Sequence, residues 1–157
     1  RFVVMGKNLP TEAAAVTAKV TVGDATMDAT VLSAAADRIE ALLPDSTATG
    51  TGAVELTINE LKLTAPIRVV ASAYGVFTRA ALGKGLAVAN GPEGVEITVT
   101  RPAVVGEVVT LRGTGLGPDP GTAELLIGSL GPITGTVTRE EQGIDLVQFE
   151  VPAQIEG

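Results

Sequence analysis

Three short motifs occur twice in this chain, in the same order and at nearly the same separation. The pairs are GKNLP (6–10) with GTGLG (113–117), KVTVGD (19–24) with ELLIGS (124–129), and RIEALLPD (38–45) with LVQFEVPA (146–153), at offsets of 107, 105 and 108. Ordered matches at almost constant offset predict an internal duplication. The repeat length suits one small domain and a connector. We therefore expect two domains, residues 1–71 and 72–157.

The stretch VVTLRGTGLGPDPG (108–121) has the outline of a phosphate-binding glycine loop. Two prolines and Gly121 follow, so the helix that a dinucleotide site needs is excluded, and no Gly-Lys-Ser/Thr is present. Within the repeat, Asn8 aligns with Gly115, and Asn and Gly are the residues that most readily adopt positive φ. The loop is therefore interpreted as a structural corner. The predicted turn positions of the two copies are Gly6, Asn8, Gly113, Gly115, Gly117, Gly23 and Gly128.

Composition indicates an all-β, turn-rich chain whose core is built from Val, Ile, Leu and Ala. It is 45% hydrophobic, with 19 Gly, 9 Pro and only four aromatic residues. Turn signals recur about every ten residues, which is typical of β-sandwiches. The expected strands are Phe2–Met5, Lys19–Val22, Ala29–Leu32, Arg38–Leu43, Ile67–Ala71, Leu86–Ala89, Val95–Thr100, Val108–Leu111, Glu124–Ile127, Gly135–Arg139 and Ile144–Val151.

The clearest local signal is a β-hairpin in AVELTINELKLTAPI (53–67). Apolar and polar residues alternate on both sides of Asn59-Glu60, which suits a two-residue turn. Five residues are expected to share one buried face: Val54, Leu56, Ile58, Leu61 and Leu63. The alanine runs at 13–15 and 34–36 are expected to form loops or short 3₁₀ segments. Residues 72–106 have no counterpart in the first copy and are expected to form an irregular, hairpin-containing connector.

Charge and cysteine content limit the partners. The net charge is −7 with a pI near 4.5, so nucleic acid and anionic membranes are poor partners. The chain has no cysteine, which excludes disulfides and thiolate metal sites. No apolar run reaches the length of a membrane span. Because the sequence begins at Arg1 without Met, we expect a fragment or a processed product.

Several motifs resemble a C-terminal repeat family of large secreted acidobacterial proteins (Solibacter-type). They are Tyr74–Phe77, Gly83–Ala87, Pro102–Leu111 and Thr114–Gly117. The family shows Pro where this chain has Tyr74. The repeated units are also similar to IPT/TIG immunoglobulin-like domains, through the glycine corner, the Gly-ended strand and a late strand that closes in Pro. These resemblances imply two tandem immunoglobulin-like β-sandwiches of the E-set type, and export from the cell.

No catalytic set, cofactor or metal site is predicted. Histidine and cysteine are absent, Glu140-Glu141 reads as a solvated turn, and Lys84 reads as part of a hairpin turn. The pairs Asp119 with Glu124 and Asp24 with Asp28 lack the ligand spacing of a calcium loop. Tyr74 and Phe77 are the candidate contacts for a partner, either a polysaccharide or a protein.

The expected function is that of a non-enzymatic structural or adhesive segment of a larger exported bacterial protein, extracellular or on the cell surface. Two alternatives stay open: a polysaccharide-binding accessory domain of an extracellular enzyme, and a strand-exchanging subunit of an extracellular filament. The filament alternative follows from a comparison of the copies. The first has no counterpart of VEITVTRPAVVGE (95–107), and the second has none of the hairpin at 54–63. Each sheet is therefore expected to be incomplete, with edges open to homo-oligomers.

Overall fold

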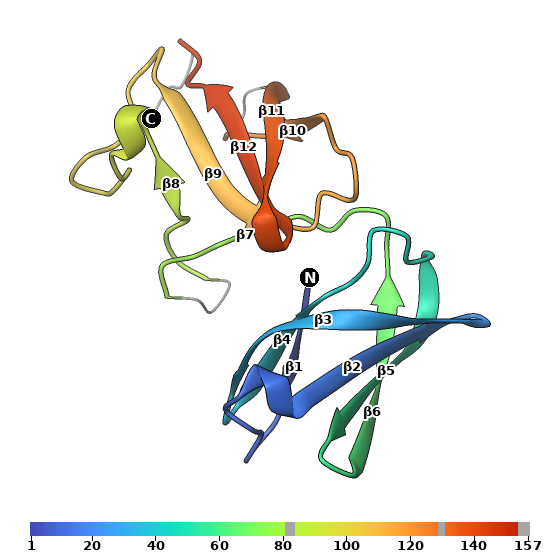
Figure 1. Ribbon diagram of the computed structural model, residues 1–157. Coiled ribbons are helices and arrows are strands. Elements are labelled where there is room, and N and C mark those ends of the chain that lie inside the picture. The colour runs from blue at the N-terminus through green and yellow to red at the C-terminus, as the bar shows by residue number, and fades with distance from the viewer. Residues whose placement is uncertain (81–83, 129–130, 154–157) are drawn as a thin grey trace. The chain divides into compact units, whose positions relative to one another are not determined.

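The computed structural model describes residues 1–80, 84–128 and 131–153, so Gly83 and Ser129 of the motifs above lie outside the described residues. The all-β prediction is confirmed: the described residues form antiparallel strands and three short 3₁₀ turns. These turns are η1 (Ala13–Ala15), η2 (Pro92–Gly94) and η3 (Glu141–Gly143). The chain divides into two compact units, Arg1–Ala71 and Ser72–Gly157 (Figure 1).

Unit 1 contains one curled six-stranded sheet with the order β1-β4-β3-β2-β5-β6. Its strands are β1 (Phe2–Met5), β2 (Val16–Val22), β3 (Ala25–Ala35), β4 (Arg38–Leu42), β5 (Gly50–Ile58) and β6 (Leu61–Val69). The curl follows from β3, because its first half pairs with β2 and its second half pairs with β4. The register of β3 shifts between Val31 and Ser33, and such a bulge increases local bend and twist.

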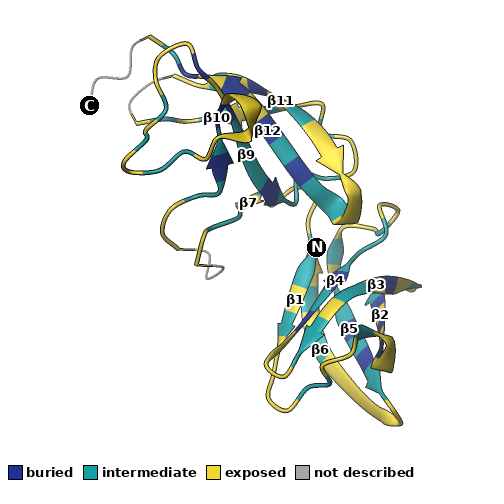
Figure 2. Ribbon diagram, turned by 60° about the vertical axis from the view of Figure 1, so that its left-hand side comes forward, coloured by how far each residue is buried: buried dark blue, intermediate teal, exposed yellow. Residues whose placement is uncertain are grey.

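The core of unit 1 lies between the two halves of this sheet. In β2, residues alternate between buried Val16, Ala18, Val20 and Val22 and more exposed polar neighbours, as expected for a half-buried strand (Figure 2). Ile39 of β4 is fully buried in the same cluster. Each buried Val or Ile contributes about 1.5–3 kcal/mol of hydrophobic stabilisation.

The predicted hairpin is present, but half of its apolar face is not buried. Ile58 pairs with Leu61 across a turn in which Asn59 has a φ of 54°, and Leu56 pairs with Leu63. The β5 side chains of this face lie in the core, whereas Leu61 and Leu63 are 60% and 40% exposed. The prediction of one buried face was therefore wrong for β6. The alternation of apolar and polar residues in β6 was predicted correctly. However, β6 is the last strand of the sheet, and its apolar residues next to the turn are not covered.

Unit 2 contains a second antiparallel sheet with the order β10-β11-β12-β9-β7, and β8 also pairs with β9. Its strands are β7 (Gly75–Val76), β8 (Ala89–Asn90), β9 (Val108–Thr114), β10 (Thr122–Leu125), β11 (Ile133–Glu140) and β12 (Ile144–Glu150). The buried cluster contains Ala89, Val109, Phe149 and Val151. Buried residues of β12 alternate with less buried ones, so one face of β12 is the floor of this core.

The run β1-β4-β3-β2 has the same strand order as β9-β12-β11-β10. The register agrees as well. Val4 pairs with Ile39 in unit 1, and Leu111 pairs with Val147 in unit 2. Leu111 lies 107 residues after Val4, and Val147 lies 108 residues after Ile39, as the offsets of the repeat predict. Among the described residues, each unit then has an element that the other lacks. Beyond β2, unit 1 adds β5 and β6, whereas β10 ends its sheet. Beyond β9, unit 2 adds β7 and β8, whereas β1 ends its sheet.

Three local predictions were wrong and one was right. The strand expected at Leu86–Ala89 is reduced to an isolated bridge at Ala87 and to β8, which begins at Ala89. Residues 95–100 form no strand, because η2 precedes them and Thr98 then closes a turn, its Oγ1 accepting the Arg101 N–H at 2.9 Å. Ala34 and Ala35 extend β3, since pairing with Ile39 and Arg38 outweighs the helical preference of alanine. The 3₁₀ prediction for Ala13–Ala15 is confirmed.

Candidate functional site

The glycine corner after β9 is a close-packed backbone crossing. Gly115 has a φ of 102°, and Asn8 at the aligned position of unit 1 has a φ of 57°. A Cβ on Gly115 would lie 2.4 Å from the carbonyl oxygen of Ala73. The Ala73 N–H in turn donates to the Gly115 carbonyl at 2.7 Å. Glycine is thus required at 115 by the φ angle and by the neighbouring backbone of Ala73, and both requirements concern the fold.

The remaining turn glycines have different roles. Gly23 and Gly128 both have a φ of 58°, and Gly117 has a φ of 94°. Gly113 lies beneath the Tyr74 ring, since an added Cβ would come within 2.6 Å of it. Gly6 has no positive φ and lies against the side chain of Leu9.

A buried acid holds the corner of unit 2 in place. Asp145 of β12 is fully buried and lies opposite Arg139 of β11. Its carboxylate accepts the Arg139 Nε–H at 2.9 Å, an Nη2–H at 2.6 Å and the backbone N–H of Leu116 at 2.9 Å. Arg139 also donates to the carbonyls of Gly117 and Pro118. The pair therefore satisfies the loop backbone that the glycines bend, as a buried charge requires.

This pair was missed by sequence reasoning, which placed Arg139 at the end of the strand expected at 135–139, next to the solvated turn at Glu140-Glu141. The turn itself is exposed at Glu141 and Gln142, and Gln142 has a φ of 61°. One signal was available: Asp145 shares the parity of Val147 and Phe149, so the alternation placed a carboxylate on the core face. Asp145 therefore needed a cationic partner nearby.

A second acid closes the turn before β9. Glu107 is almost buried, accepts the Val104 N–H at 3.0 Å and pairs with Arg101 at 2.7 Å. The hydrogen bond from Val104, with the Arg101 guanidinium, holds the pKa of Glu107 below its usual value. The preceding Gly106 has a φ of 79°. Glu107 lies within the motif Pro102–Leu111, and its contacts hold the turn before β9.

The aromatic candidates, Tyr74 and Phe77, are both half-buried. Tyr74 lies over Gly113, and burial, with the negative charge of Asp145, raises the pKa of Tyr74 to about 12. Its hydroxyl has no hydrogen-bond partner among the described residues. Phe77 donates its backbone N–H to the Arg112 carbonyl at 2.9 Å. Both residues thus attach the first segment of unit 2 to β9, which leaves less ring surface for stacking on a sugar.

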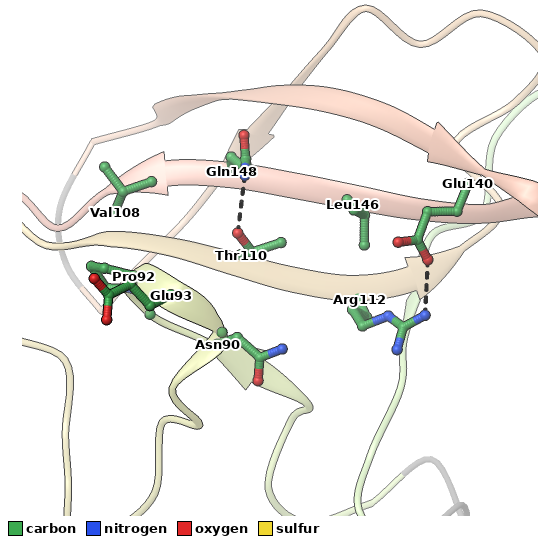
Figure 3. Close-up of a pocket in the computed structure, with 11 residues that line it drawn as sticks. Asn90, Pro92, Glu93, Val108, Thr110, Arg112, Glu140, Leu146 and Gln148 are labelled. Atoms are coloured by element: carbon green, nitrogen blue, oxygen red, sulfur yellow. Dashed lines mark hydrogen bonds and ion pairs between the residues drawn. The ribbon is translucent and has the colours of Figure 1, made fainter.

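A groove of about 560 Å³ in unit 2 lies over β9 and β12 (Figure 3). Gln148 donates to the Thr110 hydroxyl at 3.2 Å on its floor, and Arg112 pairs with Glu140 at 2.8 Å at one end. Asn90 faces this floor from β8. The groove offers amide, hydroxyl and paired charged groups, which can bind a polar ligand.

The other candidate residues lie apart from one another. Lys84, Asp119 and Glu124 are exposed, and Asp28 pairs loosely with Lys19 at 3.8 Å. Within the described residues, no group of three or more acidic side chains is placed to hold a metal ion. No described helix is long and apolar enough to cross a membrane.

A narrower groove of about 240 Å³ lies in unit 1, between its two edge strands. Val4 and Met5 of β1 line one side, and Leu56 of β5 and Leu63 of β6 line the other. The lining is largely apolar, and three of its residues, Val54, Leu56 and Leu63, belong to the hairpin face that the sequence predicted to be buried. This groove and the bare edge of β1 are the parts of unit 1 best suited to bind another chain.

Comparison of the chain with protein-family models, with curated proteins and with solved structures gives no match. The family resemblance therefore rests on the motifs themselves, and the functional argument rests on the geometry of the two units.

Proposed function

We propose that this chain is a non-enzymatic structural or adhesive segment of a larger exported bacterial protein, and that its two units are tandem immunoglobulin-like sandwiches of the IPT/TIG, E-set type. One observation carries the proposal: four strands of each unit share their order and their register. The Val4–Ile39 pair and the Leu111–Val147 pair occupy equivalent places. A repeated sandwich that presents loops and sheet edges is the usual architecture of modular cell-surface proteins.

The chemistry of the best-placed polar groups supports a structural role. Asp145 and Glu107 are the two buried charged side chains of the described residues, and each is satisfied by an arginine and by backbone N–H groups. A catalytic acid or base must instead be able to exchange a proton with a substrate. Both carboxylates hold turns that flank β9, so they serve the fold of unit 2.

Labelling of intact cells tests the proposal. An epitope tag inserted after Asn59, in the exposed β5–β6 turn, should be reached by antibody and removed by external protease without lysis. A periplasmic or cytosolic marker protein in the same cells is the control. Labelling that requires lysis would contradict export and overturn the proposal.

Stretching the whole chain between its ends tests the tandem architecture. Two independent sandwiches should unfold in two separate force events, each releasing the length of roughly 70–85 residues at about 3.3–3.6 Å per residue. A single event that releases the whole length would contradict two independent domains.

A second candidate function is a strand-exchanging subunit of an extracellular filament. The observation that favours it is that, among the described residues, the sheets end at β1 and at β10, whereas the other unit has further strands at each equivalent place. Open edges are templates for pairing with another chain. Concentration-dependent polymers in negative-stain micrographs of the purified chain would support this candidate, and a monomer at all concentrations would exclude it.

A further inference from the structure

The outer edge of β1 is bare and unprotected. β1 consists of four apolar residues, FVVM, and is the last strand of its sheet. Val3 and Met5 are 48% and 69% exposed. Among the described residues, no strand pairs with this edge. Proteins usually protect such an edge with charge, proline or a covering segment.

The opposite edge of the same sheet carries that protection. β6 contains Pro66, which offers no N–H to a new strand. The same strand also carries two charged residues, Lys62 and Arg68. Lys62 is further paired with Glu55 at 3.0 Å. The contrast indicates that β6 is built to stay an edge and that β1 is built to be covered.

Unit 2 shows what covers the equivalent edge. Arg112 of β9, which aligns with Met5 at the offset of 107, exchanges two backbone hydrogen bonds on its outer side. It donates to the Val88 carbonyl at 3.2 Å and accepts the Phe77 N–H at 2.9 Å. On either side of this point β7 pairs with residues 113–114 and β8 pairs with residues 110–111, both antiparallel. Two short pieces thus act together as one added strand.

The groove beside β1 has room for the inward side chains of such a strand. Its volume of about 240 Å³ lies between Val4 of β1 and Leu63 of β6, with Leu56 of β5 at its base. An extended segment along β1 would place alternate side chains into this space and would cover Leu63. The groove is large enough for a few apolar side chains but too small for the edge of a folded sheet.

We infer that the β1 edge and its groove form a docking site for an extended polypeptide segment of a partner protein. This segment is added antiparallel to β1 and carries small or apolar residues at alternate positions. The inference rests on the proposed tandem architecture, because the covered β9 edge is its template. A second copy of this chain is a poorer occupant, since a four-residue edge is short against the roughly 800 Å² per partner of a stable interface. The mode is β-strand addition, in which backbone bonds give affinity and pockets give specificity.

A peptide copied from unit 2 is the probe. Residues 72–77 joined to 89–91, SAYGVFANG, reproduce the added strand in continuous form. Titrated into the ¹⁵N-labelled full chain, this peptide should shift the amide signals of Val3–Met5 and of Leu63. It should also slow hydrogen exchange of the Met5 amide at least tenfold. The same peptide with Pro in place of Phe lacks the N–H that Phe77 donates in unit 2 and should bind at least tenfold more weakly.

Two variants of β6 provide a matched pair. Leu63 lines the groove, whereas Leu61, two residues away on the same face, does not. Leu63→Lys should weaken the peptide at least tenfold, and Leu61→Lys should change its affinity less than twofold. Both residues are partly exposed, so both variants should fold, which the amide spectra of the free proteins will show.

Three outcomes would overturn the inference: no shifts in unit 1 at millimolar peptide, shifts confined to unit 2, or equal effects of the two variants. Light scattering adds a fourth. If the free chain is a dimer in which the β1 amides are already protected, a second copy is the occupant instead. None of these outcomes depends on where the protein resides, so cell labelling can fail or succeed independently.

Discussion

Asp145 and Arg139 lie directly opposite each other on β12 and β11, and their side chains form two hydrogen bonds of 2.9 and 2.6 Å. The carboxylate is fully buried, while the arginine side chain is 28% exposed and reaches over to the glycine corner. The pair therefore couples the β11–β12 hairpin to the loop that follows β9.

Removing this carboxylate should destabilise unit 2 strongly. Asp145→Ala removes the acceptor of the Leu116 N–H and the Asp145 carboxylate that accepts two hydrogen bonds from Arg139. We expect a loss of about 3–5 kcal/mol, toward the lower figure because Arg139 is partly exposed. Tyr74 is the only tyrosine and the chain has no tryptophan, so tyrosine fluorescence during urea unfolding reports on unit 2 alone.

The exposed pair Arg112–Glu140 is the matched control for Asp145. Its two side chains are 39% and 45% exposed, so Glu140→Ala should cost less than about 1 kcal/mol. Equal losses in the two variants would show that burial of Asp145 does not govern its contribution.

Alanine variants of Gly115 and Gly121 distinguish the energetic cost of backbone strain from that of steric conflict. Both have positive φ, but only a Cβ on Gly115 would meet backbone, whereas nothing lies within 4 Å of one on Gly121. Gly121→Ala should cost about 1–2 kcal/mol from the left-handed conformation alone. Gly115→Ala should cost clearly more, and Gly115→Val more again. Comparable urea midpoints for the two alanine variants would refute the close backbone crossing.

The Glu107 carboxylate should make the stability of unit 2 depend on pH in the acid range. Its pKa is lowered in the folded state, so its contribution is present above the ordinary value of 4.5 and is lost as pH falls through the folded-state pKa. The difference in unfolding free energy between wild type and Glu107→Gln should be largest at neutral pH and should shrink toward acid. A difference that is constant from pH 7 to pH 2 would contradict this account.

The Tyr74 hydroxyl should ionise at a higher pH than an ordinary tyrosine, and its ionisation can be measured directly. Its pKa is raised from 10 to about 12, so the neutral ring is favoured by the fold and stability falls as pH rises above 10. Absorbance of tyrosinate at about 295 nm belongs to this single tyrosine. We expect half-ionisation near pH 12 in the folded chain and near 10 in urea. A midpoint near 10 under native conditions would mean that the ring is not packed over Gly113.

Local patterns were sufficient for much of the fold. Alternation in β2 and β12, the Asn59-Glu60 turn and the Asn8–Gly115 alignment depend on neighbouring residues, and each corresponds to what the structure contains. They succeed because side-chain period and φ preference are properties of a few consecutive residues.

Local patterns failed where pairing or a turn overrides the preference of single residues. Ala34 and Ala35 joined a strand because Ile39 and Arg38 of β4 pair with them, and residues 95–100 form no strand because the Thr98 hydroxyl closes a turn with the Arg101 N–H. Period alone could not place the Arg139 guanidinium beside Asp145 at the glycine corner, since that depends on how β11 and β12 pair and where the loop after β9 passes.

By itself, the sequence determined that the chain is all-β and which turns need glycine or asparagine, because these features are encoded in composition and short spacing. Only the tertiary structure decided which apolar faces are covered. Leu56 and Leu63 are paired residues on one face, yet one is buried and the other is 40% exposed. Burial depends on what lies opposite a face, and for β6 that position is an open groove beside a bare β1.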